Sequence, residues 1–306
     1  MEIHRSIEAL PLFRNAVITI GTFDGVHLGH QKILHALVQQ ALKVNGESVL
    51  ITFEPHPRKI VNPSISLQLI NTLDEKIELL QTKCIDHLVI VSFTSLFSEQ
   101  SPEEYIHDFL INRFHPHTII IGYDHHFGKN RKGNYRLLED RAATYNYQLI
   151  EIPKHVLNEI GISSTKIRTA LLESNVEEAN ELLGYLFYFE GKVVEGDKLG
   201  RQLGYPTANL VYTDLDKIHL GEGVYAVYTI VNGMQKKGMM NIGTRPTVNG
   251  TIKKVEVNIF DFDGDLYGRE IRVLVKNYLR TQKKYETLDA LKKQISIDKE
   301  QSLRLL

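Results

Sequence analysis

The sequence of 306 residues has a single cysteine, no excess of basic residues and no long apolar run. One cysteine, Cys84, excludes an internal disulfide and a metal site built from several cysteines. We interpret it as a packing residue rather than a nucleophile, because it lies just before an apolar run. The 36 basic and 37 acidic residues leave a net charge of −1. Proteins that neutralise nucleic-acid phosphates usually carry a basic excess, so small-molecule substrates are favoured over nucleic acid.

Apolar runs also stay well below the roughly 18 residues that a membrane span needs. The first residues have no signal-peptide core, so we expect a cytoplasmic protein without a membrane partner. With 42% apolar and 24% charged residues, the composition is that of a globular protein, and the length suits two domains. The sequence has no internal repeat, and it does not predict an oligomeric state.

The first half alternates compact β-branched runs with helical periodicity. Strands are expected at residues 16–20, 48–53, 87–93, 118–122 and 147–152. Helices are expected at residues 29–44, 74–83, 102–112 and 135–145. Short apolar strands separated by helices predict a Rossmann-like, doubly wound parallel sheet in an α/β domain.

The pattern changes near residue 184. A helix over 176–183 is followed by short strands separated by glycine turns, at residues 191–194, 223–231, 237–242, 254–260 and 270–278. Strands without intervening helices predict an antiparallel β-barrel, which a helix over 287–305 follows. The predicted domains are therefore residues 1–183 and 184–306.

A glycine-rich turn follows the first strand and leads into the first helix. Gly21 and Gly25 allow close approach of the backbone to a phosphate, and a helix N-terminus attracts anions. His27 and His30 are three residues apart, so they share a helix face and can donate to a triphosphate. The alternative is a plain turn with two solvated histidines. The predicted ATP contacts in this turn are Gly21, Phe23, Asp24, Gly25 and Gly29.

The run His27-Leu28-Gly29-His30 resembles the HxGH signature of the nucleotidylyltransferase superfamily. Its companion there is a late Ser/Thr-rich helix start, which residues 162–168 resemble. Ser164 and Thr165 can cap that helix and donate to phosphate, and Arg168 adds a fork of donors. An ordinary helix cap with a surface arginine is the alternative.

Two loops narrow the resemblance to the bacterial bifunctional riboflavin kinase/FAD synthetases. Residues 53–57, Phe-Glu-Pro-His-Pro, resemble the loop after the second strand, and residues 122–128 resemble a second family loop. His125 stands where that family usually has phenylalanine. The flavin contacts that the resemblance implies are Phe53, Pro55, His56, Asp124 and Phe127. Packing in the core or loop rigidity is the alternative for the aromatic residues.

The second half resembles the riboflavin kinase signature over residues 191–201 and 204–209. The nucleotide contacts implied there are Gly196, Lys198, Gly200, Arg201, Pro206, Thr207 and Asn209. The resemblance implies that Thr207 and Asn209 also hold Mg²⁺ through side-chain oxygens, which suit a hard cation. It makes Glu256, in an otherwise apolar strand, the base for the riboflavin 5′-hydroxyl. A salt-bridged strand carboxylate is the alternative.

The resemblance spans about residues 5–300 and implies two reactions. Riboflavin and MgATP give FMN in the barrel, and FMN and ATP give FAD and pyrophosphate in the first domain, with His27 and His30 as catalytic groups. Asn258 and Tyr285 depart from the usual histidine and phenylalanine. One alternative is a transferase for another phosphate acceptor, such as a pantetheine or nicotinate phosphate. Another is a flavin-binding or storage module.

Overall fold

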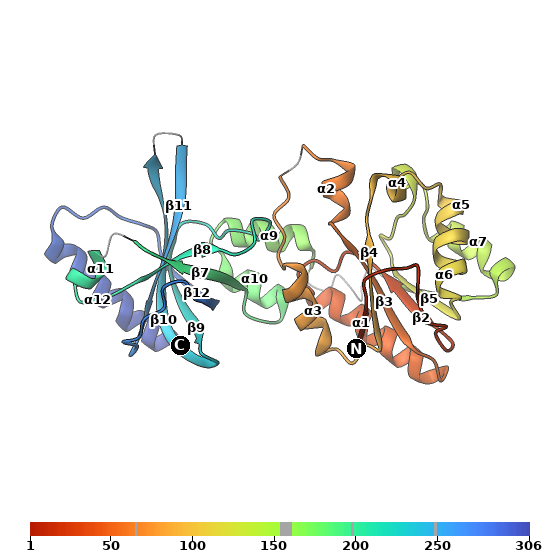
Figure 1. Cartoon of the computed structure of the whole chain (residues 1–306), viewed down its shortest axis with the longest axis horizontal. Coiled ribbons are helices and arrows are strands. Elements are labelled where there is room, and N and C mark those ends of the chain that lie inside the picture. Colours follow the sequence, from red (N-terminus) through yellow and green to blue (C-terminus); the bar gives the residue numbers. More distant parts are fainter. Residues whose placement is uncertain (65, 154–160, 197–198, 248–249) are drawn as a thin grey trace. The chain divides into compact units, whose positions relative to one another are not determined.

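The computed structural model describes residues 1–64, 66–153, 161–196, 199–247 and 250–306. Its first compact unit, Met1–Ser163, is built on a six-stranded, all-parallel sheet (Figure 1). Its strands are β1 Glu2–His4, β2 Val17–Ile20, β3 Ser48–Glu54, β4 His87–Ser92, β5 Thr118–Gly122 and β6 Gln148–Ile152. They lie in the order β1-β4-β3-β2-β5-β6, so the predicted doubly wound sheet is confirmed.

Helices cover both faces of this sheet, as the alternation of buried side chains requires. Ile18, Ile51 and Ile119 pack with the helical segment 102–114 and Leu138 on one face. Val17, Leu50 and Ile120 pack on the other face with α1 Leu28–Lys43 and α3 Leu73–Gln81. The remaining helices here are α2 Pro57–Val61, α4 Ser95–Ser98, α7 Tyr135–Tyr145 and the 3₁₀ turn η2 Lys129–Arg131.

Two features of this unit differ from the predicted pattern. The helix expected over 102–112 is divided into α5 Pro102–Glu104, a π-helical segment η1 Tyr105–Ile111 and α6 Asn112–Phe114. The wider π turn places residues 105, 106, 109 and 110 together in the core. Strand β1 was not predicted, because three residues are too short for an alternation to be recognised.

The second compact unit, Ser164–Leu306, contains a closed six-stranded antiparallel barrel in the order β10-β11-β8-β7-β12-β9. The strands are β7 Tyr188–Val194, β8 Ala208–Tyr212, β9 Gly223–Val231, β10 Met234–Thr247, β11 Gly250–Ile259 and β12 Glu270–Arg280. The helices are α9 Ser164–Leu172, α10 Val176–Leu183, α11 Leu199–Gln202 and α12 Leu288–Leu305. The predicted barrel and terminal helix are confirmed, whereas β8 and the short helix α11 were not expected.

Helices α9 and α10 belong to the compact unit of the barrel, which begins before the predicted domain boundary at 183/184. Asn180 of α10 donates to the carbonyl of Val275 at 3.0 Å and accepts from the Phe187 N–H at 2.7 Å. Glu177 accepts from the Tyr278 N–H at 2.9 Å. These bonds join α10 to β12 and to Phe187, the residue before β7. The predicted boundary separates the two activities, and it stays a prediction.

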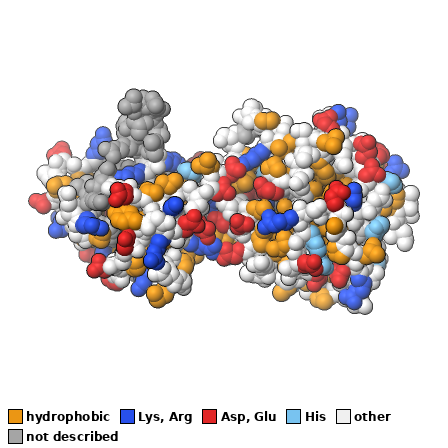
Figure 2. Space-filling model, in the orientation of Figure 1, with side chains coloured by type: hydrophobic (Ala, Val, Ile, Leu, Met, Phe, Trp, Pro, Cys, Tyr) orange, Lys and Arg blue, Asp and Glu red, His pale blue; other side chains and the backbone are white. Residues whose placement is uncertain are grey.

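Acidic and basic side chains are interspersed over the face in Figure 2, in keeping with the balanced net charge. Within the part of the chain that the structure describes, every helix is too short or too polar to cross a membrane.

Candidate functional site

The predicted phosphate-binding turn lies at the point where the strand order of the sheet reverses. From β2 the chain proceeds through β3 to β4, and it then returns to place β5 on the other side of β2. Ligands of such sheets bind beyond the carboxyl ends of the strands at this position. The turn after β2, the 53–57 loop after β3 and the 122–128 loop after β5 all begin at that edge. Topology therefore brings three predicted segments to one edge.

The turn between β2 and α1 has an unusual backbone. Phe23, Gly25 and Val26 all have positive φ angles, of 47°, 88° and 36°. Glycine adopts this region freely, whereas a β-branched residue such as Val26 does so at a cost of about 1–3 kcal/mol. Burial of Phe23 and Val26 in the core beneath the turn offsets that cost. Backbone strain of this kind is typical of functional loops.

His27 and His30 lie together at the start of α1. Their rings are stacked, with centroids 3.6 Å apart and planes inclined by 15°. His27 is the N-cap residue, and its Nδ1 accepts the His30 N–H at 3.3 Å. The Nδ1 of His30 is buried and has no hydrogen-bond partner among the described residues. A buried nitrogen without a partner at a helix N-terminus is suited to meet a polar ligand.

Electrostatics keep His30 neutral when no ligand is bound. Burial lowers the pKa of His30 well below its ordinary value, and the neighbouring His27 and Lys76 lower it further. Lys76 lies in the first turns of α3 and is itself 5% exposed. Burial also lowers the pKa of Lys76, although the carboxylates of Asp24 and Glu54 oppose this shift. A triphosphate would reverse the balance by favouring the charged form of both groups.

Asp24 has a structural contact within the same turn. Its carboxylate is buried and accepts the backbone N–H groups of Ile70 at 2.9 Å and Asn71 at 3.2 Å. Those residues precede Thr72, which caps α3 in a capping box with Glu75. Asp24 thereby fixes the start of the helix that carries Lys76. Its predicted contact with ATP stays a prediction.

The predicted flavin-binding residues divide into buried and exposed groups. Phe53 packs against Phe93 and Phe97, and Phe127 stacks on Tyr105 with ring centroids 4.8 Å apart. Both rings therefore pack in the core beneath the loops at residues 53–57 and 122–128. Pro55 and Asp124 are exposed, and His56 is buried as the N-cap of α2. The contact of all five with a flavin stays a prediction.

His125, the departure from the family pattern, is also held neutral. Its Nε2 is buried and has no hydrogen-bond partner among the residues described. Burial, helped by His126 and Arg131, lowers its pKa to about 4. Its ring lies 5.8 Å from that of Phe127, so an imidazole occupies an aromatic position of the loop.

Ser164, Thr165 and Arg168 form the first turns of α9 in the second compact unit. Thr165 is exposed and the other two side chains are half-buried. The buried side chains of this helix are Ile167, Ala170 and Leu171. Ser164 lies beside Ile167 and Leu171 at helical spacing, whereas Thr165 points away from them. The contact of the three polar residues with a triphosphate stays a prediction.

The barrel brings three polar residues into one row across neighbouring strands. Glu256 of β11 lies opposite Asn209 of β8 and opposite Asn241 of β10. Residues opposite one another share a sheet face. The Oδ1 of Asn209 is buried and has no hydrogen-bond partner in the described part of the chain. Lys254, two residues before Glu256, forms an ion pair with it at 2.9 Å.

Small residues border this row where a side chain would not fit. A Cβ at Gly196 would lie 2.1 Å from the Asn209 amide nitrogen. A Cβ at Gly200 would lie 2.3 Å from the carbonyl of Tyr205 and 3.4 Å from the Thr207 hydroxyl. Asn258 donates to the carbonyl of Pro206 at 2.6 Å, which fixes the segment before β8. Arg201 is exposed, and Lys198 lies outside the described residues.

These two units define a class: an α/β unit with an HxGH turn, joined in one chain to an antiparallel barrel with a row of polar residues. The family model described as FAD synthetase matches residues 11–166, and the one described as riboflavin kinase matches residues 183–306. The chain therefore belongs to the bifunctional riboflavin kinase/FMN adenylyltransferase family.

Two relatives of that name illustrate the match. The protein of Buchnera aphidicola subsp. Schizaphis graminum is 41% identical, over 93% of this chain and 92% of its own length. The protein of Escherichia coli K12 is 35% identical, over 92% of this chain and 90% of its own. A solved structure, titled as a macrolide-efflux protein from Streptococcus pneumoniae, is 30% identical. It covers 97% of both chains with a TM-score of 0.88.

Sequence reasoning missed Lys76. Its signal was nevertheless present, because Lys76 is placed with the apolar residues Ile77 and Leu80 on the buried face of the predicted helix. A lysine on such a face is rarely buried without a charged partner or a function.

Proposed function

We propose that the chain converts riboflavin to FAD in two steps, with the kinase in residues 184–306 and the adenylyltransferase in residues 1–183. The observation that carries the proposal is the stacked His27–His30 pair at a helix N-terminus, on the same chain as the row of Asn209 and Glu256. Flavin and ATP are the small-molecule substrates, and the cytoplasm is the proposed location.

In the adenylylation step, the FMN phosphate attacks the α-phosphorus of ATP and pyrophosphate leaves. FMN supplies the nucleophile, so the protein contributes positioning and charge stabilisation. His27, His30 and the first N–H groups of α1 would bind the phosphates, and Lys76 adds a buried cation near them. Ser164, Thr165 and Arg168 are the further phosphate donors.

In the kinase step, the riboflavin 5′-hydroxyl attacks the γ-phosphorus of ATP and ADP leaves. Glu256 accepts the hydroxyl proton, and Lys254 forms an ion pair with its carboxylate at 2.9 Å. The unpartnered Oδ1 of Asn209 fits a hard cation, since it is an acceptor that lacks a donor. With the Thr207 hydroxyl it would hold Mg²⁺, which when bound neutralises charge on the phosphates.

The glycine residues 196 and 200 keep backbone close to these side chains, and Arg201 and Lys198 provide positive charge for the nucleotide. In the first unit, we expect the loops after β3 and β5 to receive the flavin, because both begin at the same edge of the sheet as the histidine turn. Their candidate contacts are Pro55, His56 and Asp124, with Phe53 and Phe127 behind them.

Incubation of the full chain with riboflavin, ATP and Mg²⁺, followed by chromatography, tests the proposal. FMN should appear first and FAD afterwards. FMN supplied with ATP should give FAD without riboflavin. Unchanged riboflavin in the presence of tight flavin binding would favour a binding module, and no product from any flavin would favour a transferase for another acceptor.

A further inference from the structure

A second group of polar residues lies at the amino-terminal edge of the parallel sheet, at the opposite ends of the strands from the histidine pair. Strand β1 pairs in parallel with β4, and Glu2 lies opposite His87, the first residue of β4. Glu2 and His4 are two residues apart, so they share a face of β1. Strand register therefore brings one carboxylate and two imidazoles together.

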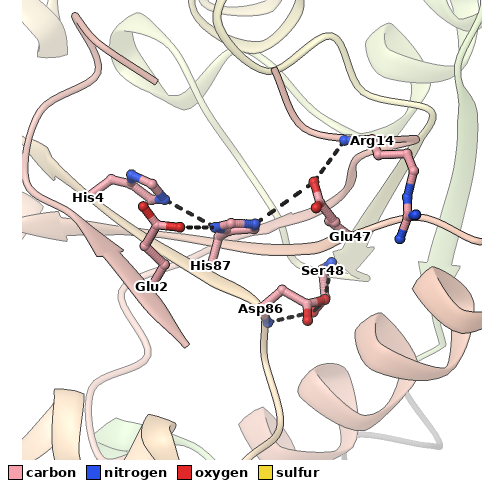
Figure 3. Close-up of polar contacts among 7 residues, drawn as sticks. All are labelled: Glu2, His4, Arg14, Glu47, Ser48, Asp86 and His87. Atoms are coloured by element: carbon pink, nitrogen blue, oxygen red, sulfur yellow. Dashed lines mark hydrogen bonds and ion pairs between the residues drawn. The ribbon is translucent and has the colours of Figure 1, made fainter. Parts of the chain in front are cut away.

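The distances within this group match those between ligands of one metal ion. His4 Nε2 lies 3.1 Å from His87 Nδ1, and Glu2 Oε2 lies 3.7 Å from the same nitrogen. All three ligand atoms fall within 4.8 Å of one another, and Figure 3 shows the two rings facing each other with Glu2 beside them. Two nitrogens at about 2.05 Å from zinc are roughly 2.9–3.4 Å apart at angles between 90° and 109°. The two histidines already have this separation.

A carboxylate lies behind His87. The other ring nitrogen of His87, Nε2, is 3.9 Å from Glu47 Oε2 (Figure 3), which is longer than a hydrogen bond. Glu47 is in turn held by the Arg14 N–H at 2.8 Å. A carboxylate in this position orients a histidine ligand when it accepts the free ring N–H. The ring of Phe13 lies 4.9 Å from His87 and 5.9 Å from His4 and forms an apolar wall.

The three residues already contact one another, through a hydrogen bond between the two histidines and an ion pair between His87 and Glu2.

We propose that Glu2, His4 and His87 form a three-ligand site for Zn²⁺ or a similar first-row divalent ion, with water as the remaining ligand. Two nitrogens and one oxygen suit these ions and disfavour Mg²⁺. The bound ion would join the three-residue edge strand β1 to β4. This inference does not depend on the flavin reactions.

Calorimetric titration of the full chain with zinc chloride at pH 7.5 tests the site. The background is His27→Asn with His30→Asn, which removes the other histidine pair. His4→Gln and His87→Gln should each weaken zinc binding at least tenfold, and Glu2→Gln should weaken it less. His107→Gln is the matched control, because His107 has a carboxylate partner, Asp108, at 2.6 Å. It should leave zinc affinity unchanged.

A cobalt titration gives a second measurement. Visible d–d absorption should appear with one Co²⁺ per chain and be lost in the His4 and His87 variants. Glu2 is 67% exposed, so Glu2→Gln keeps the fold and reports on the site even where a histidine variant does not. Equal zinc affinity in the background chain and in Glu2→Gln and His4→Gln would overturn the proposal and leave only the hydrogen-bonded pair.

Discussion

The two candidate sites are built in opposite ways. In the α/β unit Asp24, His27 and Lys76 are buried, and a strained turn, a helix cap and an anchored carboxylate fix the positions around them. In the barrel the groups form a row on a strand face, in which Glu256 and Lys254 are about one-third exposed and glycines leave room beside Asn209. The first site is preorganised by its backbone, whereas the second relies on small residues and a partly solvated ion pair. Because both sites are on one chain, the activity of one is a reference for substitutions in the other.

The largest effect is expected for His27→Asn combined with His30→Asn. Asparagine retains the N-cap bond, so the helix start should persist. Removal of two phosphate donors at about 10²–10³ each should lower FAD formation from supplied FMN by about 10⁴–10⁶. FMN formation from riboflavin should stay unchanged. His35→Asn, at an exposed position of α1, is the control, and an equal loss of both activities would contradict the division between units.

In the barrel, Glu256→Gln should lower FMN formation by about 10²–10⁴, the range of general-base catalysis. FAD formation from supplied FMN should not change. Glu256 acts either as the base or only as a partner of Lys254, and Lys254→Met distinguishes these roles because it breaks the ion pair and keeps the carboxylate. We expect Lys254→Met to lower the rate of FMN formation less than about tenfold. Similar losses in both variants would mean that Glu256 acts only through its salt bridge.

The two units also differ in how much of their fold the sequence could predict. The parallel sheet was predictable because each strand is a compact apolar run, and β2, α1 and the turn between them follow one another directly. Strand β8 was not, since residues 208–212 overlap and follow the signature of residues 204–209, which was interpreted through its implied nucleotide contacts. Its place in the barrel depends on pairing with β7 and β11, which local pattern does not contain.

The same distinction holds for the sites. The proximity of His27 and His30 follows from helical spacing, so local sequence was sufficient. The position of Glu256 opposite Asn209 needs the register of two strands 47 residues apart. The aromatic character of Phe53 and Phe127 suggested ligand stacking, but only tertiary packing places both in the core. The role of Asp24 as an anchor for residues 70 and 71 was likewise invisible.

Gly196→Ala tests whether small residues define the barrel site. The added Cβ would meet the Asn209 amide at 2.1 Å and displace it. We expect FMN formation to fall about tenfold to a hundredfold, which is 1.4–2.8 kcal/mol of transition-state stabilisation. Gly233→Ala is the control, because that glycine has a φ of 76° in a turn with open space around it. It should cost stability and leave the rate of the folded enzyme unchanged.

The smallest effect is expected for His125, whose contribution to stability tests whether burial keeps the ring neutral. The folded pKa of about 4 lies below the ordinary value of 6.5. Between these values the unfolded chain binds more protons, so the free energy of unfolding rises with pH and falls on acidification. From pH 8 to pH 5.5 this contribution falls by about 1.4 kcal/mol.

Substitution of His125 by phenylalanine, the residue of the family pattern, should remove that contribution. Urea unfolding at pH 8, 6.5 and 5.5 measures it, with His35→Gln as the control that keeps the wild-type slope. An NMR titration of the His125 ring, assigned by its loss in His125→Phe, gives the pKa directly. A midpoint near 6.5 would show that the ring is solvated, and the contrast between a buried α/β site and a partly open barrel site would then not extend to this loop.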